Sequence, residues 1–167
     1  MDEVTRRSFF GKMIALIAGV IAACLSYPIL GYTLLPAFKK EEEAWAEMGP
    51  LDRIPVNQPK EFQINRTLSS GWMKTNSVQT VWAFRKPEGP AVVYSPLCTH
   101  LGCGYHWDDQ ERKFICPCHN SVYDMDGQVL SGPAPRPLDT LPTQVKDDRL
   151  FILYKEFKTG LSGKQEI

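Results

Sequence analysis

The 167-residue sequence has no excess of charge of either sign. Nineteen Lys and Arg residues are balanced by nineteen Asp and Glu residues, and the pI is about 6.8. Such a chain has no basic patch with which to neutralise a phosphate backbone. It also has no low-complexity segment, and no internal repeat beyond the two short boxes described below. We therefore set nucleic-acid binding aside.

One stretch has no charged residue at all. Residues 13–35 contain no Asp, Glu, Lys, Arg or His, and as a helix rising ~1.5 Å per residue they cover about 35 Å, more than the ~30 Å hydrocarbon core of a bilayer. The run also lacks a small-residue cleavage site, and it is longer than the apolar core of about 7 to 15 residues in a cleaved signal peptide. We expect residues 13–36 to form a retained, single-pass transmembrane helix.

The residues before this run are Thr5-Arg6-Arg7-Ser8-Phe9-Phe10, which resemble a twin-arginine export signal. That route exports folded proteins and suits a chain that acquires a metal centre first. The plainer interpretation is two positive charges flanking an ordinary anchor. Both leave residues 1–12 in the cytoplasm and the main domain outside the cell membrane. Cys24, after Ile21-Ala22-Ala23, also fits a lipoprotein processing site, with a small apolar helix residue as the alternative.

Beyond the apolar run the composition changes. Residues 37–50 are expected to be a linker, because 39–48 are charged residues and good helix formers and Gly49-Pro50 ends the segment. A helical extension and a hinge both fit it. Prolines and glycines are concentrated after residue 48, which indicates short strands and tight turns, an all-β sandwich or small barrel. The predicted strands are 61–67, 78–84, 91–95, 113–116, 128–130, 143–146 and 150–154, with hairpin turns at 86–90 and 147–148.

Cysteine and histidine are few and concentrated. Four of the five cysteines and all three histidines lie within residues 98–119, mostly in two boxes, Cys98-Thr99-His100-Leu101-Gly102-Cys103 and Cys116-Pro117-Cys118-His119. Each box offers one Cys and one His to a four-ligand site and leaves one Cys over. Zinc sites usually pair Cys with Cys and His with His. Mixed boxes also suit a [2Fe-2S] centre in which one iron takes two cysteines and the other takes two histidines.

The two boxes resemble those of Rieske iron-sulfur proteins. The resemblance implies one [2Fe-2S] cluster, with Cys98 and Cys116 on the buried iron, His100 and His119 on the outer iron, and Cys103 disulfide-bonded to Cys118. It implies an antiparallel β-sandwich with a small cluster-binding subdomain over residues 51–157, followed by a C-terminal tail, 158–167. A disulfide persists in oxidising compartments, and soluble Rieske oxygenases and ferredoxins generally lack this pair, which favours the membrane-anchored branch.

The resemblance also implies how the cluster is tuned and covered. Ser121 and Tyr123 match positions whose hydroxyls bond a cluster sulfide and a ligand cysteine sulfur; turn polarity and core packing are the alternative. Ser131-Gly132-Pro133-Ala134-Pro135 resembles the family's proline-rich loop, which covers the cluster from a third side. Asn120 stands where glycine usually follows the second ligand histidine, and Asn tolerates positive φ better than most residues. His106 matches neither box and is expected at the surface.

By resemblance, the chain is expected to be the electron-carrying Rieske subunit of a bacterial quinol:cytochrome c or plastocyanin oxidoreductase of the cytochrome bc or b6f class. His119, next to His100, would accept the quinol hydroxyl hydrogen bond and its proton, and Leu101 would line the quinol-facing surface. Implied partners are a cytochrome b subunit, a c-type cytochrome and a membrane quinol in a dimeric complex. The alternative function is the Rieske electron-transfer subunit of an exported molybdenum enzyme such as arsenite oxidase.

Overall fold

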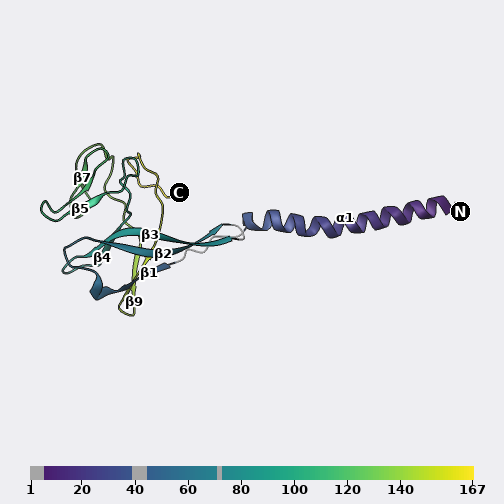
Figure 1. Cartoon of the computed structure of the whole chain (residues 1–167), viewed down its shortest axis with the longest axis horizontal. Helices are drawn as coiled ribbons and strands as arrows, with labels where there is room; N and C mark the ends of the chain where they lie inside the picture. The colour runs from purple at the N-terminus through teal and green to yellow at the C-terminus, as the bar shows by residue number, and fades with distance from the viewer. Residues whose placement is uncertain (1–5, 39–44, 71–72) are drawn as a thin grey trace. The chain divides into compact units, whose positions relative to one another are not determined.

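The computed structural model describes residues 6–38, 45–70 and 73–167 (Figure 1). Within these residues the chain forms one long helix, α1 (Arg6–Phe38), one short 3-10 helix, η1 (Leu51–Arg53), and ten β-strands. The chain divides into two compact units, one containing α1 and the other containing most of the strands. The all-β class predicted from the proline and glycine distribution is confirmed.

From Met13 onward, helix α1 is uncharged on all sides. It is the one helix in the described ranges that is long and apolar enough to cross a membrane, and its most apolar window has no buried residue. Leu16 and Leu25 are 68% and 59% exposed. Exposing such apolar side chains to water costs free energy, and a lipid environment removes that cost. Pro28 and Pro36 lie inside the helix, where membrane spans accommodate the freed carbonyls through neighbouring groups.

The β domain contains three sheets, and every strand pair with a defined register is antiparallel. Their strand orders are β1-β10-β9, β2-β3-β4 and β5-β6-β7-β8. The strands are β1 (Trp45–Pro50), β2 (Lys60–Ser70), β3 (Met73–Arg85), β4 (Ala91–Tyr94), β5 (His106–Asp108), β6 (Lys113–Cys116), β7 (Ser121–Tyr123), β8 (Val129–Ser131), β9 (Thr143–Lys146) and β10 (Arg149–Leu153).

All seven predicted strands overlap an observed one. The turn between β9 and β10 has positive φ at Asp147 and Asp148, 49° and 59°, as a two-residue hairpin requires. Strands β5 and β7, each of only three residues, were not predicted. Apolar alternation is hard to recognise over so short a run, although β8, which is equally short, was predicted.

The predicted linker contains the third unpredicted strand. A helix continuing to Met48 is wrong for 45–48, because these residues lie in β1 and pair with β10 from Trp45 opposite Leu153 onward. Ala46 is buried and Met48 packs on the same core, so alternate residues face inward with the period of a strand. This tertiary pairing outweighs the helix propensity of the segment. Residues 39–44 of the linker lie outside the described ranges.

Two hydrophobic cores fill the β domain. The larger core is built from aliphatic residues of the sheets, such as Ile54, Val81 and Ile152. The smaller core is rich in aromatic rings. The Phe114 ring packs edge-on against two of them, with its centroid 5.4 Å from that of Tyr105 and 4.8 Å from that of Trp107. Cys98 and Cys116 belong to this second core, so the fold places two sulfur atoms inside an aromatic shell.

Candidate metal centre

The first box forms a tight loop between β4 and β5, which we call the first cluster loop (residues 98–103). The Cys98 amide donates to the Cys103 carbonyl at 2.8 Å, and the Gly102 amide donates back to the Cys98 carbonyl at 2.9 Å. Gly102 has φ +76°, a conformation that costs glycine little. The loop closes on itself and directs Cys98 inward, 1% exposed, while His100 is half-buried and Leu101 is 62% exposed.

The second box connects β6 to β7 as the second cluster loop (residues 116–121). Cys116 ends β6 and pairs with Ser121, the first residue of β7, so the loop is a short hairpin connection. Asn120 adopts φ +55°, which confirms that asparagine can occupy this turn in a left-handed conformation. Cys116 is buried, and His119 is exposed.

The two loops bring their histidines together. The rings of His100 and His119 lie 4.7 Å apart, centroid to centroid, and meet edge to face at 88°. The two box cysteines that remain free, Cys98 and Cys116, are both buried. The candidate donor set therefore has an inner sulfur side within the aromatic core and an outer imidazole side at the surface.

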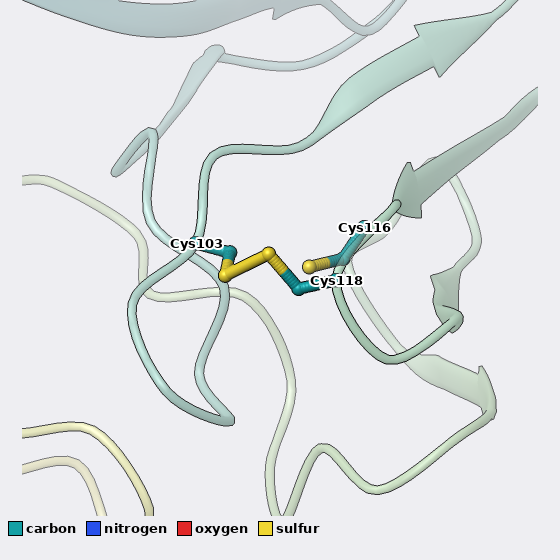
Figure 2. Close-up of side chains that lie close together, drawn as sticks. All are labelled: Cys103, Cys116 and Cys118. Atoms are coloured by element: carbon teal, nitrogen blue, oxygen red, sulfur yellow. A yellow bond between two sulfur atoms is a disulfide. The ribbon is translucent and has the colours of Figure 1, made fainter.

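A disulfide joins the two loops. Three cysteine sulfurs lie within 4.8 Å of one another, and Figure 2 shows two of them, those of Cys103 and Cys118, bonded together beside the side chain of Cys116. This pairing is the one that the resemblance implied, and it is confirmed. Because a disulfide sulfur has no thiolate charge to offer a metal, Cys116 is the one residue of this group whose sulfur could bind a metal.

The family of the chain follows from its sequence over the same region. The model of the Rieske [2Fe-2S] domain matches residues 45–142. The chain belongs to the Rieske [2Fe-2S] family. Its cofactor is one Rieske [2Fe-2S] cluster.

The chain is similar to three known proteins. The chain is 29% identical over 156 residues to the menaquinol:cytochrome c reductase iron-sulfur subunit of Geobacillus thermodenitrificans, covering 90% of this chain and 91% of that protein. It is 31% identical over 150 residues to the cytochrome b6-f complex iron-sulfur subunit of Chlorobaculum tepidum, covering 90% and 76%. The crystal structure of a cyanobacterial plasma membrane Rieske protein from Synechocystis PCC 6803 is 30% identical with a TM-score of 0.40, covering 54% and 84%.

Helix α1 and the family together support a single-pass membrane protein. The helix contains the predicted span, residues 13–36, and begins within the predicted twin-arginine segment at Arg6. Cys24 is free and exposed on this helix.

The residues around the donor set fit a Rieske cluster. Ser121 Oγ is fully buried and has no hydrogen-bond partner among the described residues, although a buried hydroxyl without a partner costs about 1 to 3 kcal/mol. A cluster sulfide is an acceptor of the kind this hydroxyl needs.

The Cys116 thiol has a raised pKa, and burial is the main cause. A hydrogen bond from the Cys118 amide lowers this pKa, whereas the Cys98 side chain raises it. A buried thiol whose ionisation is disfavoured in this way suits a cation, which deprotonates it.

The Tyr123 hydroxyl contacts a cysteine sulfur, as expected of a residue that tunes the cluster. Its hydroxyl lies 3.1 Å from Cys98 Sγ and 3.2 Å from Thr99 Oγ1. Burial, with an added contribution from Cys98, raises the pKa of Tyr123 well above its ordinary value, so the phenol keeps its proton. Because Thr99 gives its own proton to the Arg136 carbonyl at 2.7 Å, its oxygen can only accept from Tyr123. The single phenol proton of Tyr123 is therefore directed to Thr99 Oγ1 while Cys98 is a thiol, and to Cys98 Sγ when that sulfur is a thiolate.

The proline-rich segment 131–135 lies against the second cluster loop. Gly132 has φ +93°, and a Cβ atom placed on it would lie 2.5 Å from the Ser121 Cα atom and 2.6 Å from the Asn120 carbonyl oxygen. Only glycine permits this approach. The predicted third loop therefore contacts the cluster site.

Three buried residues of the site were not singled out from the sequence. Thr99 is fully buried between Tyr123 and Arg136, and Arg136 and Asp139 form a buried ion pair with a 2.7 Å contact. Arg136 and Asp139 belong to no recognisable motif. The one feature of the sequence that could have indicated their ion pair is the spacing of the opposite charges, three residues apart. His106, in contrast, is exposed on β5, as expected of a surface residue.

Proposed function

We propose that Cys98 and Cys116 bind the inner iron of the cluster and that His100 and His119 bind the outer iron. The proposal is supported by the burial of both cysteines, the 4.7 Å approach of the two histidine rings and the disulfide that removes Cys103 and Cys118 from the donor set. Neutral imidazoles in place of two thiolates reduce the negative charge at the site. The cluster, when bound, supplies one-electron redox chemistry in the Rieske range of about −150 to +300 mV.

On this assignment the chain is the iron-sulfur subunit of a quinol:cytochrome c oxidoreductase of the bc or b6f class. It oxidises quinol at the outer membrane face and passes the electron to a c-type cytochrome. The observation that carries the proposal is the exposure of His119 in a family whose relatives include a menaquinol:cytochrome c reductase subunit. Its partners are a cytochrome b subunit, a c-type cytochrome and a membrane quinol, in a dimeric complex.

The chemical step assigned to the chain is acceptance of a proton. The ring nitrogen of His119 that is free of iron accepts the hydrogen bond of the quinol hydroxyl, and His100 lies at its edge. Positive charge close to an imidazole lowers its affinity for a proton, so proton and electron uptake at the site are coupled. Leu101, 62% exposed beside His100, supplies apolar surface for the quinol ring.

The orientation proposed for the chain places residues 1–12 in the cytoplasm and the β domain outside. Arg6, Arg7 and Lys12 precede the uncharged run, and positively charged residues next to a span favour the cytoplasmic side. The disulfide is consistent with this orientation, because disulfides persist in oxidising compartments.

Native membranes provide the test of this function. Purification of the chain in mild detergent is expected to recover a cytochrome b with it, and anaerobic quinol is expected to reduce the cluster and then a c-type cytochrome, measured by electron paramagnetic resonance and haem absorbance. Oxidised quinone is the control and should reduce neither. Recovery of a molybdenum-containing subunit, with no reduction by quinol, would replace this function with the alternative one.

Tyr123→Phe is expected to lower the midpoint potential of the cluster while leaving it assembled. Loss of the hydroxyl removes a hydrogen bond to Cys98 Sγ that stabilises the extra electron of the reduced state. A redox titration followed by electron paramagnetic resonance measures the shift. The matched control is Tyr94→Phe, in the same core, whose hydroxyl bonds the Met125 carbonyl. Equal potentials in the two variants would remove Tyr123 from the tuning role.

A further inference from the structure

The C-terminal segment, expected as a tail, is held against the first cluster loop. The Gly160 amide donates to the Thr99 carbonyl at 2.9 Å. A Cβ atom on Gly160 would lie 3.5 Å from the His100 carbonyl oxygen, and one on Gly102 would lie 3.6 Å from Thr159 Cγ2. Residues 158–161, which we call the strap, therefore pack on the backbone that joins the proposed ligands Cys98 and His100.

The strap is itself anchored at both ends. Phe157, immediately before it, is buried in the larger core. After the strap, the chain turns back and residues 165–167 pair with residues 156–158. The Lys158 amide donates to the Gln165 carbonyl at 2.9 Å, and the Ile167 amide donates to the Glu156 carbonyl at 3.0 Å. Such a closed, hydrogen-bonded loop has a defined shape, so its contact with Thr99 is ordered.

Arg136 fastens the strap to the site. Its guanidinium donates through Nη1 to the Leu161 carbonyl at 2.7 Å and through Nη2 to the Lys158 carbonyl at 2.8 Å. The same group forms two hydrogen bonds with Asp139, at 3.1 and 2.7 Å, and both side chains are nearly inaccessible, 4% and 6% exposed. A buried guanidinium is stable only when its charge and its donors are satisfied, and here the carboxylate and the two strap carbonyls satisfy them.

The backbone of Arg136 reaches the cluster side as well. Its carbonyl accepts the hydroxyl proton of Thr99, whose oxygen in turn contacts Tyr123. One residue thus connects the strap, through its side chain, and the network at Cys98, through its carbonyl. Its fork of donors is what allows two separate carbonyls and a carboxylate to be held at once.

We propose that Arg136 is a positioning residue, which acts with the strap to fix the first cluster loop and hence the orientation of His100 on the outer iron. The proposal rests on the ligand assignment above. The strap meets the first cluster loop through the backbone of residues 99–102, and Arg136 meets that loop through Thr99. Loss of the strap is therefore expected to loosen the first cluster loop and to leave the remainder of the β domain folded.

The test compares two variants of the 167-residue chain that remove the strap contacts in different ways. Removing Arg136 alone would leave Asp139 buried and unpaired, so the first variant is Arg136→Met combined with Asp139→Leu, which keeps the volume apolar. The second ends the chain after Phe157 and leaves the ion pair in place. The control is Glu166→Gln, which breaks the exposed pair with Lys155 in the same C-terminal segment without touching the strap.

Three readouts separate positioning from general stability. Both variants are expected to release iron to a chelator several-fold faster than the parent, to change the line shape of the electron paramagnetic resonance spectrum, and to speed amide exchange at Cys98 and Gly102 while β9 and β10 exchange as before. The control should match the parent in all three.

Two results would count against different claims. Uniformly faster exchange, with the parent line shape and iron-release rate, would make the ion pair a general stabiliser and overturn the positioning role. Absence of a Rieske spectrum from the parent would instead overturn the ligand assignment, so the parent is measured first.

Discussion

His119→Ala is expected to abolish both the Rieske spectrum and quinol oxidation. The substitution leaves the outer iron with a single imidazole, His100, and removes the one proposed ligand that is exposed. Loss of one metal ligand and of the proposed proton acceptor together reduces quinol-dependent reduction of the acceptor to background. Electron paramagnetic resonance of the membranes and a quinol:cytochrome assay measure the two losses separately.

The matched control for this substitution is His106→Ala. His106 is also exposed and lies on the neighbouring strand β5, where its backbone pairs with Ile115, so its loss should leave both signals intact. The His119→Ala chain should retain its disulfide, which shows that the domain has folded. Quinol oxidation that persisted without a cluster would sink the proposed mechanism.

Removal of the disulfide, by Cys103→Ser with Cys118→Ser, is expected to destabilise the β domain by about 3 kcal/mol. A disulfide that closes a loop of this size lowers the conformational entropy of the unfolded chain by about that amount of free energy. The bond spans a sequence separation of 15 and is the one covalent link between the two cluster loops in the described residues. For a domain of about 100 residues such a loss lowers the melting temperature by roughly 10 °C or more. Thermal loss of the cluster's visible absorption measures it.

Cys24→Ser is the control for the disulfide variant. Cys24 is a free cysteine on α1, so its replacement changes the thiol content without changing the cluster loops. The parent protein treated with a thiol reductant should reproduce the double variant, because both open the same bond. An unchanged melting temperature in the double variant would mean that hydrogen bonds and packing hold the loops together unaided.

The chemistry of the site was predictable because it depends on rare residues at short spacing. Cys98 and His100 lie two positions apart, and Cys116 and His119 lie three apart, so each loop can present both donors whatever the rest of the fold. The extra cysteine of each box was likewise informative, and the disulfide is observed. Asn120 illustrates a local departure that physical reasoning handled correctly, since its φ of +55° is one that asparagine tolerates.

The remainder depends on contacts that no local pattern encodes. Residues 45–48 are mostly good helix formers, yet β10, far away in sequence, offers them a strand partner. The strap reaches Thr99 across about 60 residues through a backbone amide, and a backbone amide has no sequence signature. Arg136 and Asp139 read as ordinary surface charges, and only the folded chain shows that both are buried.

Gly132, in the proline-rich segment 131–135, limits how the cluster site can be redesigned. The atoms that a side chain at Gly132 would meet belong to the backbone of residues 120 and 121, so no change of rotamer can make room for it. Gly104, next to the first cluster loop, has nothing within 4 Å of the same added atom. Variants designed to alter access to the cluster can therefore place side chains at Gly104, beside the first cluster loop, whereas Gly132 has to remain glycine.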